Sequence, residues 1–436
     1  MTKLESRILR LMTAMPMWLL MGLGPGVLAA FAVIILYTAG GDAGTDRYRM
    51  GPRLEPATPP PPSILLLKAA QSTQIFQTPP AGEVTLHLPH GPGNPRNCMG
   101  AFVTLAGGRV LLAYQHHTGE DWDDMSPAVV TGRISEDGGR TWAAQDRLLV
   151  ANDAACNVGG PSLLRLDDGR IGLWYHRMQS LADCRLWMRT SADEGESWGE
   201  PVLCMPAPGY FVIANQRAVR LAGGRLMVPA AYHRTRLDDL SDPAAFDLRG
   251  IWMFFLSDDA GQTWREAADW WTLPRASVSG AHEPGVVELA DGSIWSWART
   301  STGRQWQMRS EDGGERWSLP APTHLRSPIS PMAVATLPTG DLLAVWNDRD
   351  RRWGLPLPDL ASRRTPLTCA LSSDGARTWH SAQLIESDVT RAYSYPAIHV
   401  VGDAVLLAYG CSEDPSGLPE MCVRRVPIGW FYGLAE

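Results

Sequence analysis

The sequence lacks the cysteine and glycine motifs that mark several common kinds of site. It has no C-x-x-C pair, and its seven cysteines are scattered at positions 98, 156, 184, 204, 369, 411 and 422. This spacing argues against a structural zinc site, a thioredoxin-type redox site and a disulfide scaffold. No glycine-rich phosphate loop precedes a helix. We therefore expect neither a metal nor a cofactor.

A basic surplus is also missing. The chain has 39 Lys and Arg against 46 Asp and Glu, which gives a formal charge of −7. A protein that binds a nucleic-acid backbone needs clustered basic residues to neutralise phosphates, so we expect no nucleic-acid partner.

Charge is absent from one long stretch near the N-terminus. Residues 11–41 contain no charged side chain, and residues 18–37 are apolar enough to cross a bilayer, which takes about 20 residues. Mainly basic residues precede this stretch: Lys3, Arg7 and Arg10. This asymmetry predicts a cytoplasmic N-terminus and export of the remainder, to the periplasm or the cell exterior. A cleaved signal peptide is the alternative.

These features predict three parts. Residues 1–41 form a cytoplasmic stub and membrane anchor (or signal peptide), and the membrane is therefore an expected partner. Residues 42–74 are rich in proline and lack apolar periodicity, which is typical of an extended stalk. The folded domain then occupies residues 75–436.

Tryptophan is unusually common, with eighteen residues against ten Tyr and eight Phe. Five of them end an octapeptide that has Ser, Asp, Gly and Trp at relative positions 0, 2, 4 and 7. The copies are SEDGGRTW at 135–142, SADEGESW at 191–198, SDDAGQTW at 257–264, SEDGGERW at 310–317 and SSDGARTW at 372–379, where Ala376 replaces the second Gly. The spacing suits a hairpin turn, because Ser and Asp can bind loop amides and Gly can take a left-handed conformation.

A second repeated element is a short turn followed by an alternating strand pattern. Its six copies are LAGGRVLLAY from Leu105, LDDGRIGLWY from Leu166, LAGGRLMVPAAY from Leu221, LADGSIWSWA from Leu289, LPTGDLLAVW from Leu337 and VGDAVLLAY from Val401. Repeated units of short antiparallel strands predict an all-β, six-bladed β-propeller. We expect EVTLHL at 83–88 to complete the sixth blade and close the ring.

The octapeptides resemble the Asp-box, or bacterial neuraminidase repeat, and six such units resemble the sialidase superfamily over residues 75–430. The resemblance implies an exo-α-sialidase that hydrolyses terminal sialic acids from sialylated glycans with retention, through a Tyr nucleophile. Two alternatives stay open: a non-catalytic propeller that binds acidic glycans, and a glycosidase for another acidic sugar such as a uronate. The implied site holds three Arg for the substrate carboxylate, a Tyr, a Glu base and an Asp acid.

Three arginines match this set, and a fourth is a further candidate. In HEPGVVELADGSIWSWAR, Glu283 and Arg299 stand at the family's spacing for the base and the second Arg, on adjacent strands of one hairpin. Arg364 in RTPLTCALSSDG resembles the third Arg, with Arg363 as its competitor on the opposite strand face. Arg96 in NPRNCMG takes the place of the first Arg, although the family's flanking F-R-I-P residues are missing. Arg217 in NQRAVRL is a further candidate for contact with the ligand.

The acid and the nucleophile complete the expected site. Asp124 lies eleven residues before Ser135, as the family acid does, and Asp121 and Asp123 beside it are expected to raise a carboxyl pKa by repulsion. The segment RAYSYPAIHV offers Tyr393 and Tyr395 as nucleophiles, and strand alternation predicts that both share one face. Tyr395 is favoured because it directly precedes the apolar strand. His116 and His117 are expected to be substrate contacts or surface groups.

Overall fold

The computed structural model describes residues 81–237, 242, 245–349, 353, 364–413 and 419–434. Internal contacts divide the chain into two units, Met1–Leu65 and Leu66–Glu436. The first unit, which holds the expected membrane anchor and most of the expected stalk, lies outside the described residues. Within the described ranges, no helix has the length and apolar character needed to span a bilayer.

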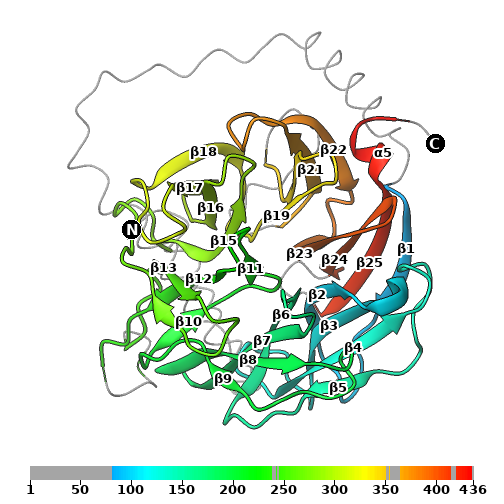
Figure 1. Cartoon of the computed structure of the whole chain (residues 1–436), viewed down its shortest axis with the longest axis horizontal. Helices are drawn as coiled ribbons and strands as arrows, with labels where there is room; N and C mark the ends of the chain where they lie inside the picture. The colour runs from blue at the N-terminus through cyan, green and yellow to red at the C-terminus, as the bar shows by residue number, and fades with distance from the viewer. Residues whose placement is uncertain are drawn as a thin grey trace, which may run out of the picture. The chain divides into compact units, whose positions relative to one another are not determined.

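The second unit is built from β-strands, with two short helical turns, η1 (Ala106–Gly108) and α5 (Ile428–Phe431), among its described residues. Four sheets have four strands each, and they are arranged with one larger sheet around a common centre (Figure 1). Three of the four-stranded sheets follow chain order: β2 (Asn97–Thr104), β3 (Val110–His117), β4 (Ala128–Ser135) and β5 (Arg147–Val150); β15 (His282–Glu288), β16 (Ile294–Arg299), β17 (Arg304–Ser310) and β18 (Ala321–Arg326); β19 (Ala333–Thr336), β20 (Leu342–Trp346), β21 (Leu367–Ser372) and β22 (His380–Glu386). This arrangement is an all-β, propeller-like fold.

The fourth four-stranded sheet joins segments from distant parts of the sequence. Its order is β1 (Glu83–Leu88), β25 (Glu420–Pro427), β24 (Ala404–Ser412) and β23 (Ala392–Val401). Strand β1 runs antiparallel to β25, with His87 opposite Cys422. The prediction that residues 83–88 complete the last sheet is confirmed.

The fifth sheet has nine strands and differs from the prediction of six separate blades. Its strands are β6 (Asn157–Arg165), β7 (Ile171–Ser180), β8 (Asp183–Ser191), β9 (Val202–Leu203), β10 (Tyr210–Val212), β11 (Val219–Arg220), β12 (Leu226–His233), β13 (Ile251–Ser257) and β14 (Arg265–Glu266). Two of the six turn-strand units, β7 and β12, lie in this one sheet. The short strand β10 pairs with β12 and, in parallel, with β8, so it fills the gap that would otherwise separate two blades.

The five Asp-boxes form turns between the third and fourth strands of their groups: β4 and β5, β8 and β9, β13 and β14, β17 and β18, and β21 and β22. In the first copy, Ser135 Oγ donates to Asp137 Oδ1 (2.8 Å) and accepts from the amide of Gly139 (2.8 Å). The amide of Thr141 donates to the same Asp137 oxygen (2.8 Å). Equivalent bonds recur in the other four copies. Ala376 takes the left-handed conformation (φ 64°) that Gly adopts in the other four, so the turn is kept despite the substitution.

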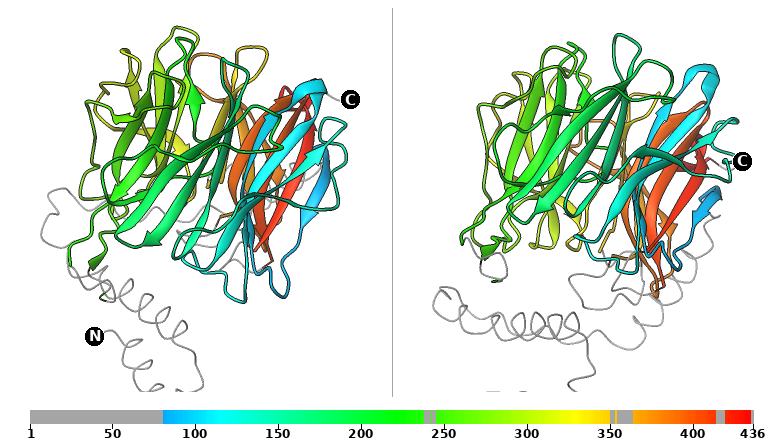
Figure 2. Two further views of the ribbon diagram at one scale, coloured as in Figure 1. Left: turned by 60° about the horizontal axis from the view of Figure 1, so that its bottom comes forward. Right: turned by 90° about the horizontal axis from the view of Figure 1, so that it is seen from below.

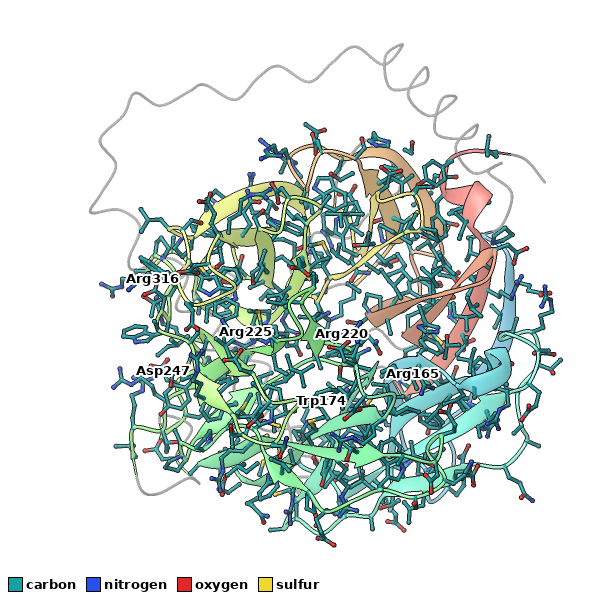
Figure 3. All side chains as sticks on the ribbon, in the orientation of Figure 1. Arg165, Trp174, Arg220, Arg225, Asp247 and Arg316 are labelled. Atoms are coloured by element: carbon teal, nitrogen blue, oxygen red, sulfur yellow. The ribbon has the colours of Figure 1, made fainter. Side chains whose placement is uncertain are left out.

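Apolar side chains fill the space between neighbouring sheets. Trp174 on β7 is fully buried, and its ring meets that of Trp264 edge-on with centroids 6.4 Å apart (Figure 3). Ion pairs link neighbouring groups at the surface; Arg225, for example, bridges Asp258 and Glu315. Figure 2 shows the strands of neighbouring sheets standing side by side around the centre. The rigid sheets thus hold their connecting loops and inner strands in fixed positions.

Candidate active site

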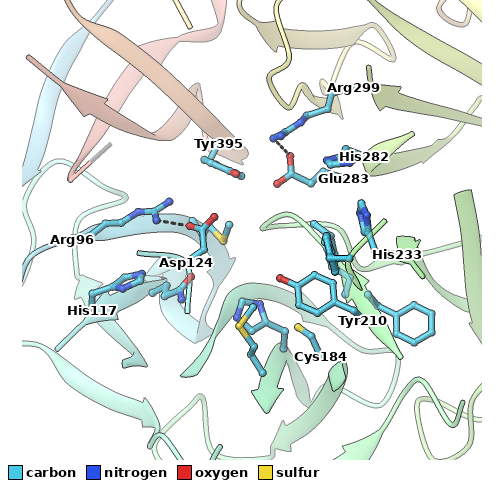
Figure 4. A pocket seen from close by; sticks show the side chains of 18 residues that line it. Arg96, His117, Asp124, Cys184, Tyr210, His233, His282, Glu283, Arg299 and Tyr395 are labelled. Atoms are coloured by element: carbon cyan, nitrogen blue, oxygen red, sulfur yellow. Dashed lines mark hydrogen bonds and ion pairs between the residues drawn. The ribbon is translucent and has the colours of Figure 1, made fainter. Parts of the chain in front are cut away.

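Five of the predicted site residues line one pocket, although they come from three different sheets (Figure 4). Arg96 precedes β2, and Asp124 lies in the loop between β3 and β4. Glu283 and Arg299 come from the paired strands β15 and β16, and Tyr395 comes from β23. Residues separated by up to 299 positions therefore face one cavity.

Glu283 and Arg299 form a buried ion pair. His282 lies opposite Arg299 in the antiparallel register, and Arg299 Nη1 donates to Glu283 Oε2 at 2.5 Å. Burial alone would raise the pKa of Glu283, but the positive charges of Arg299 and Arg364 outweigh it, and the pKa is lowered. Glu283 is therefore an ionised carboxylate, able to accept a proton or a hydrogen bond.

A second ion pair joins Arg96 to Asp124. Arg96 Nη1 donates to Asp124 Oδ1 at 2.7 Å and to the carbonyl of Trp122 at 3.3 Å. The protein atoms around the pocket act to raise the pKa of Asp124, although its side chain is exposed, but the charge and hydrogen bond of Arg96, with smaller effects of His117 and Arg364, outweigh this and the pKa is lowered. The expectation that neighbouring aspartates raise this pKa is wrong, because Asp124 is paired with a cation.

Tyr395 lies between the two ion pairs in Figure 4, and only 8% of its surface is exposed. Burial raises the pKa of its phenol, and the charge of Glu283 adds to the increase, while Arg364 and Arg299 oppose it. The guanidinium carbon of Arg364 lies 5.3 Å from the centroid of the Tyr395 ring. The phenol is thus protonated at neutral pH and has a carboxylate beside it.

Backbone bulges direct these side chains into the pocket. The inner strands β2, β6, β15 and β23 each carry one extra residue relative to the neighbouring strand. Within each bulge one residue takes a positive φ: Met99 (58°), Gly160 (57°), Glu283 (44°) and Tyr395 (53°). Non-glycine residues in this region cost about 1–3 kcal/mol each and cluster at functional sites. The strain at Glu283 and Tyr395 therefore supports a functional role.

Tyr393 is not part of the pocket. It is buried between sheets, where its ring meets Tyr409 with centroids 6.2 Å apart. The prediction that Tyr393 and Tyr395 share one strand face is wrong, because the bulge after Ser394 and the positive φ of Tyr395 break the alternation. Of these two tyrosines, only Tyr395 lines the pocket.

Arg364 and Arg217 lie behind the residues that line the pocket. Arg364 is half-buried beside the Tyr395 ring, and its Nη1 donates to Ser394 Oγ at 2.9 Å. Its competitor, position 363, lies outside the described residues.

Arg217, which was predicted to contact the ligand, is not among the residues that line the pocket. Its Nη2 donates to the carbonyl of Met332 at 2.8 Å, and its guanidinium lies 5.8 Å from the Trp297 ring centroid. Burial lowers the pKa of Arg217 to about 10, while Glu283 and Tyr395 act in the opposite direction. Arg217 is therefore a buried cation within electrostatic reach of the site.

The site has more cationic than anionic groups. Arg96 and Arg299 are each paired with a carboxylate, whereas Arg364 and Arg217 have no carboxylate partner among the described residues. Burying an unpaired charge is costly unless a partner arrives. The surplus charge therefore favours an anionic ligand, and planar guanidinium groups match a carboxylate well.

Four histidines also line the pocket: His117, His176, His233 and His282. The sequence assigned no definite role to His117, and it did not predict the other three. Burial is the main reason why the pKa of His117 falls to about 3, that of His176 to about 4 and that of His282 to about 3. Their imidazoles are thus neutral hydrogen-bonding groups. Three of them follow a Tyr at the end of the second strand of a group, in AYQHH, WYH and AYH, and this repeat in the sequence is a signal that could have identified them.

The far wall of the pocket is aromatic. Tyr210 meets Phe246 edge-on with centroids 5.0 Å apart, and His233 stacks on Phe246 at 5.2 Å. The pocket thus combines an anion-binding side, a protonated phenol beside a carboxylate, and an apolar side. This combination can hold an acidic sugar and carry out general acid–base and nucleophilic chemistry.

Comparison with known sequences supports the repeats in the chain. The sequence model of the BNR repeat-like domain matches residues 108–407. No curated protein sequence matches the chain.

Several solved structures share the fold at low sequence identity. A protein of unknown function from Dyadobacter fermentans is 18% identical with a TM-score of 0.61, over 80% of this chain and 100% of that one. The leech intramolecular trans-sialidase is 16% identical with a TM-score of 0.61, over 83% and 72%. The NanB sialidase of Streptococcus pneumoniae is 16% identical with a TM-score of 0.60, over 82% and 72%. At these identities the likeness establishes the fold alone.

Proposed function

The chain belongs to the family of BNR repeat-like domains, and we propose that it is an exo-α-sialidase that hydrolyses terminal sialic acids from glycoconjugates. The observation that carries this proposal is the surplus of guanidinium groups around Tyr395 and Glu283: Arg217 is buried, Arg364 is half-buried, and neither has a carboxylate partner among the described residues. A sialic acid bears a carboxylate on its anomeric carbon, so its binding site needs cations next to the reacting atom. The sialidases among the structures of similar fold are consistent with this substrate class.

The proposed mechanism assigns one task to each group. Arg96 and Arg299, which line the pocket, hold the substrate carboxylate, and Arg364, half-buried beside the Tyr395 ring, completes the set of three cations. Because a carboxylate nucleophile would be repelled by that group, the neutral phenol of Tyr395 attacks the anomeric carbon while Glu283 accepts its proton.

As that bond forms and the glycosidic bond breaks, Asp124 protonates the leaving oxygen. A water molecule then gives a proton to the Asp124 carboxylate and attacks the anomeric carbon, and the departing Tyr395 oxygen takes back its proton from Glu283, so the anomeric configuration is retained. Arg217 does not contact the substrate in this mechanism, and its positive charge stabilises the Glu283 carboxylate from behind.

Asp124 needs a proton for its task, yet Arg96 lowers its pKa in the free pocket. The arriving carboxylate offers Arg96 a second anion. As Arg96 turns to the substrate, its guanidinium interacts less strongly with Asp124. The pKa of Asp124 then rises, because the positive charge of Arg96 had favoured the ionised carboxylate. Substrate binding would therefore convert Asp124 into an acid.

Two related functions remain alternatives under this proposal. A glycosidase for a uronate or another acidic sugar would use the same cations. The F-R-I-P residues of sialidases are missing around Arg96, which is a reason to test such sugars. A non-catalytic glycan-binding propeller would not need a strained Tyr395 beside a carboxylate, so the positive φ values of Tyr395 and Glu283 argue for an enzyme.

The test is release of 4-methylumbelliferone by the purified full-length protein from its sialic acid conjugate and from its glucuronic acid conjugate. We expect release from the sialoside alone. Release from the glucuronide alone would replace the proposed substrate, and no release from either, with binding retained, would indicate a glycan-binding protein. Mass analysis of the product distinguishes hydrolysis from the anhydro product that is bound to the leech trans-sialidase.

We further propose that the nine-stranded sheet functions as two blades, which would give six in all, since it contains two turn-strand units. We also propose that the N-terminal apolar segment holds this domain on the extracytoplasmic side of a membrane. Extraction of membranes with alkaline carbonate tests the second point: an anchored protein stays in the pellet.

A further inference from the structure

The sheet that joins the two ends of the described chain carries a cluster of metal-binding side chains. Cys411 on β24, Cys422 on β25 and His87 on β1 offer one ligand atom each, and these three atoms all lie within 4.8 Å of one another. The two sulfur atoms are 3.0 Å apart. The cluster is separate from the candidate active site, because none of its three residues lines that pocket.

The strand register explains why these residues meet. His87 lies directly opposite Cys422, and Cys411 lies opposite Glu420, two residues before Cys422 on the same strand face. The three donors thus come from three adjacent strands. No metal was expected from the sequence, because His87 and the two cysteines lie near opposite ends of the chain and form no local motif.

We propose that Cys411, Cys422 and His87 bind a divalent, thiophilic cation of the Zn²⁺ class. Two thiolates and one imidazole form a common zinc ligand set, with a fourth position left for water or a carboxylate. Ligands held at about 2.0–2.3 Å by one tetrahedral ion lie roughly 3.3–3.8 Å from each other. The three donors therefore need to move only slightly. Each thiol releases its proton to solvent when the metal binds.

Glu420 is placed to orient the imidazole ligand. Its Oε2 lies 2.9 Å from His87 Nε2, and its Oε1 lies 3.1 Å from His90 Nδ1. A carboxylate that accepts the Nε2 proton of His87 leaves Nδ1 with a free electron pair. Metal-binding histidines commonly have such a carboxylate partner on the other ring nitrogen.

A bound ion would fasten β1 to β24 and β25. Strand β1 is the edge strand of its sheet and pairs with β25 alone. A metal ion bridging the three strands adds a second connection between segments far apart in sequence. Its role would thus be structural, as in sites where protein ligands fill most positions around the metal. A disulfide between Cys411 and Cys422 is the competing outcome, since it would remove both thiolates.

Cobalt binding by the full-length protein tests the proposal. The protein, purified with reductant and stripped of metal by a chelator, is titrated with Co²⁺. We expect one Co²⁺ per chain, with the thiolate-to-cobalt absorption in the near ultraviolet and the visible bands of a tetrahedral site, and we expect Zn²⁺ to bleach both. Absence of this absorption in the reduced wild type would overturn the proposal, whether or not the untreated protein contains a Cys411–Cys422 disulfide.

Two variants complete the test. Cys422→Ser should abolish the near-ultraviolet absorption and the rise in melting temperature that Zn²⁺ produces in the wild type. Cys156→Ser is the matched control, because Cys156 is a free thiol outside the cluster, and it should bind cobalt like the wild type. If Cys422→Ser keeps the cobalt spectrum, the site lies elsewhere and the assignment is wrong.

Discussion

Arg96 and Asp124 form an ion pair whose two side chains differ in exposure: 8% for Arg96 and 79% for Asp124. The cation is fixed in the protein, whereas the carboxylate reaches it from a loop exposed to solvent. An anionic ligand can therefore replace Asp124 without unfolding the site. This relationship leads to a prediction about pH dependence.

Activity that depends on protonated Asp124 is present below its pKa and is lost as pH rises through it. In the free enzyme Arg96 keeps this pKa below its usual value of 3.8, and in the complex the substrate carboxylate shares Arg96. We expect the alkaline limb of kcat to lie at higher pH than that of kcat/KM, measured with 3′-sialyllactose. Coincident limbs would show that substrate does not release Asp124.

Replacing Asp124 should have an effect that depends on the leaving group. A glycosidic alcohol needs protonation, a contribution of about 10²–10⁴-fold, whereas an aryl leaving group departs without it. Asp124→Ala should thus lose far more activity on sialyllactose than on the methylumbelliferyl sialoside. Asp123→Ala, in the same loop, is the control and should match the wild type on both. Equal losses on the two substrates would exclude Asp124 as the acid.

Arg299 should not tolerate lysine. A guanidinium can donate two parallel hydrogen bonds to a carboxylate and an ammonium cannot, so Arg299→Lys keeps the charge but loses the geometry. Loss of a charged hydrogen bond costs about 1.5–3 kcal/mol, which corresponds to roughly a tenfold to hundredfold decrease in kcat/KM. Arg326→Lys, at an exposed position, should be neutral. Wild-type kinetics for Arg299→Lys would remove Arg299 from the site.

The two tyrosines of β23 should differ sharply. Tyr395→Phe removes the proposed nucleophile and Glu283→Gln removes its base, so both should lose most activity on natural and aryl substrates alike. Tyr393→Phe changes a residue buried between sheets and should keep nearly full activity. Hydrolysis rates of purified, folded variants decide the matter; an active Tyr395→Phe would require another nucleophile.

The Asp-box turns should make stability depend on acid pH. Hydrogen bonds from Thr378 lower the pKa of Asp374 to about 2, and those from Ser197 lower the pKa of Asp193 to about 2. A depressed carboxyl pKa stabilises the fold above the unfolded value near 3.8, and this contribution is lost as pH falls toward 2. The melting temperature of Asp374→Asn should therefore depend less steeply on pH between 4 and 2 than that of the wild type or of Asp121→Asn. Parallel curves would contradict this reasoning.

Repeats in the sequence predicted most of the fold. The turn-strand units predicted the second strand of every group, from β3 to β24, because alternating apolar residues after a tight turn have one stable arrangement. The merged sheet was not predictable in this way. Strand β10 has three residues and no distinctive pattern, and its position depends on the open edges of its neighbours.

The candidate site, like the fold, could be predicted from the sequence only in part. Glu283 and Arg299 could be placed because they flank one hairpin, where register follows from the turn. Tyr393 and Arg217 could not be placed correctly. Their directions depend on a bulge and on packing against Trp297, and neither feature has a local sequence signal that strand alternation would reveal.

The pairing of β1 with β25 has a consequence for synthesis of the protein. A ribosome adds about 5–20 residues per second, so β1 waits for its partner for roughly 15–70 s after it has been made. During that time its backbone edge is open to other strands. Arg96 and Tyr395 are made almost as far apart in time, and the candidate active site is therefore complete only after almost all of the sequence has been translated.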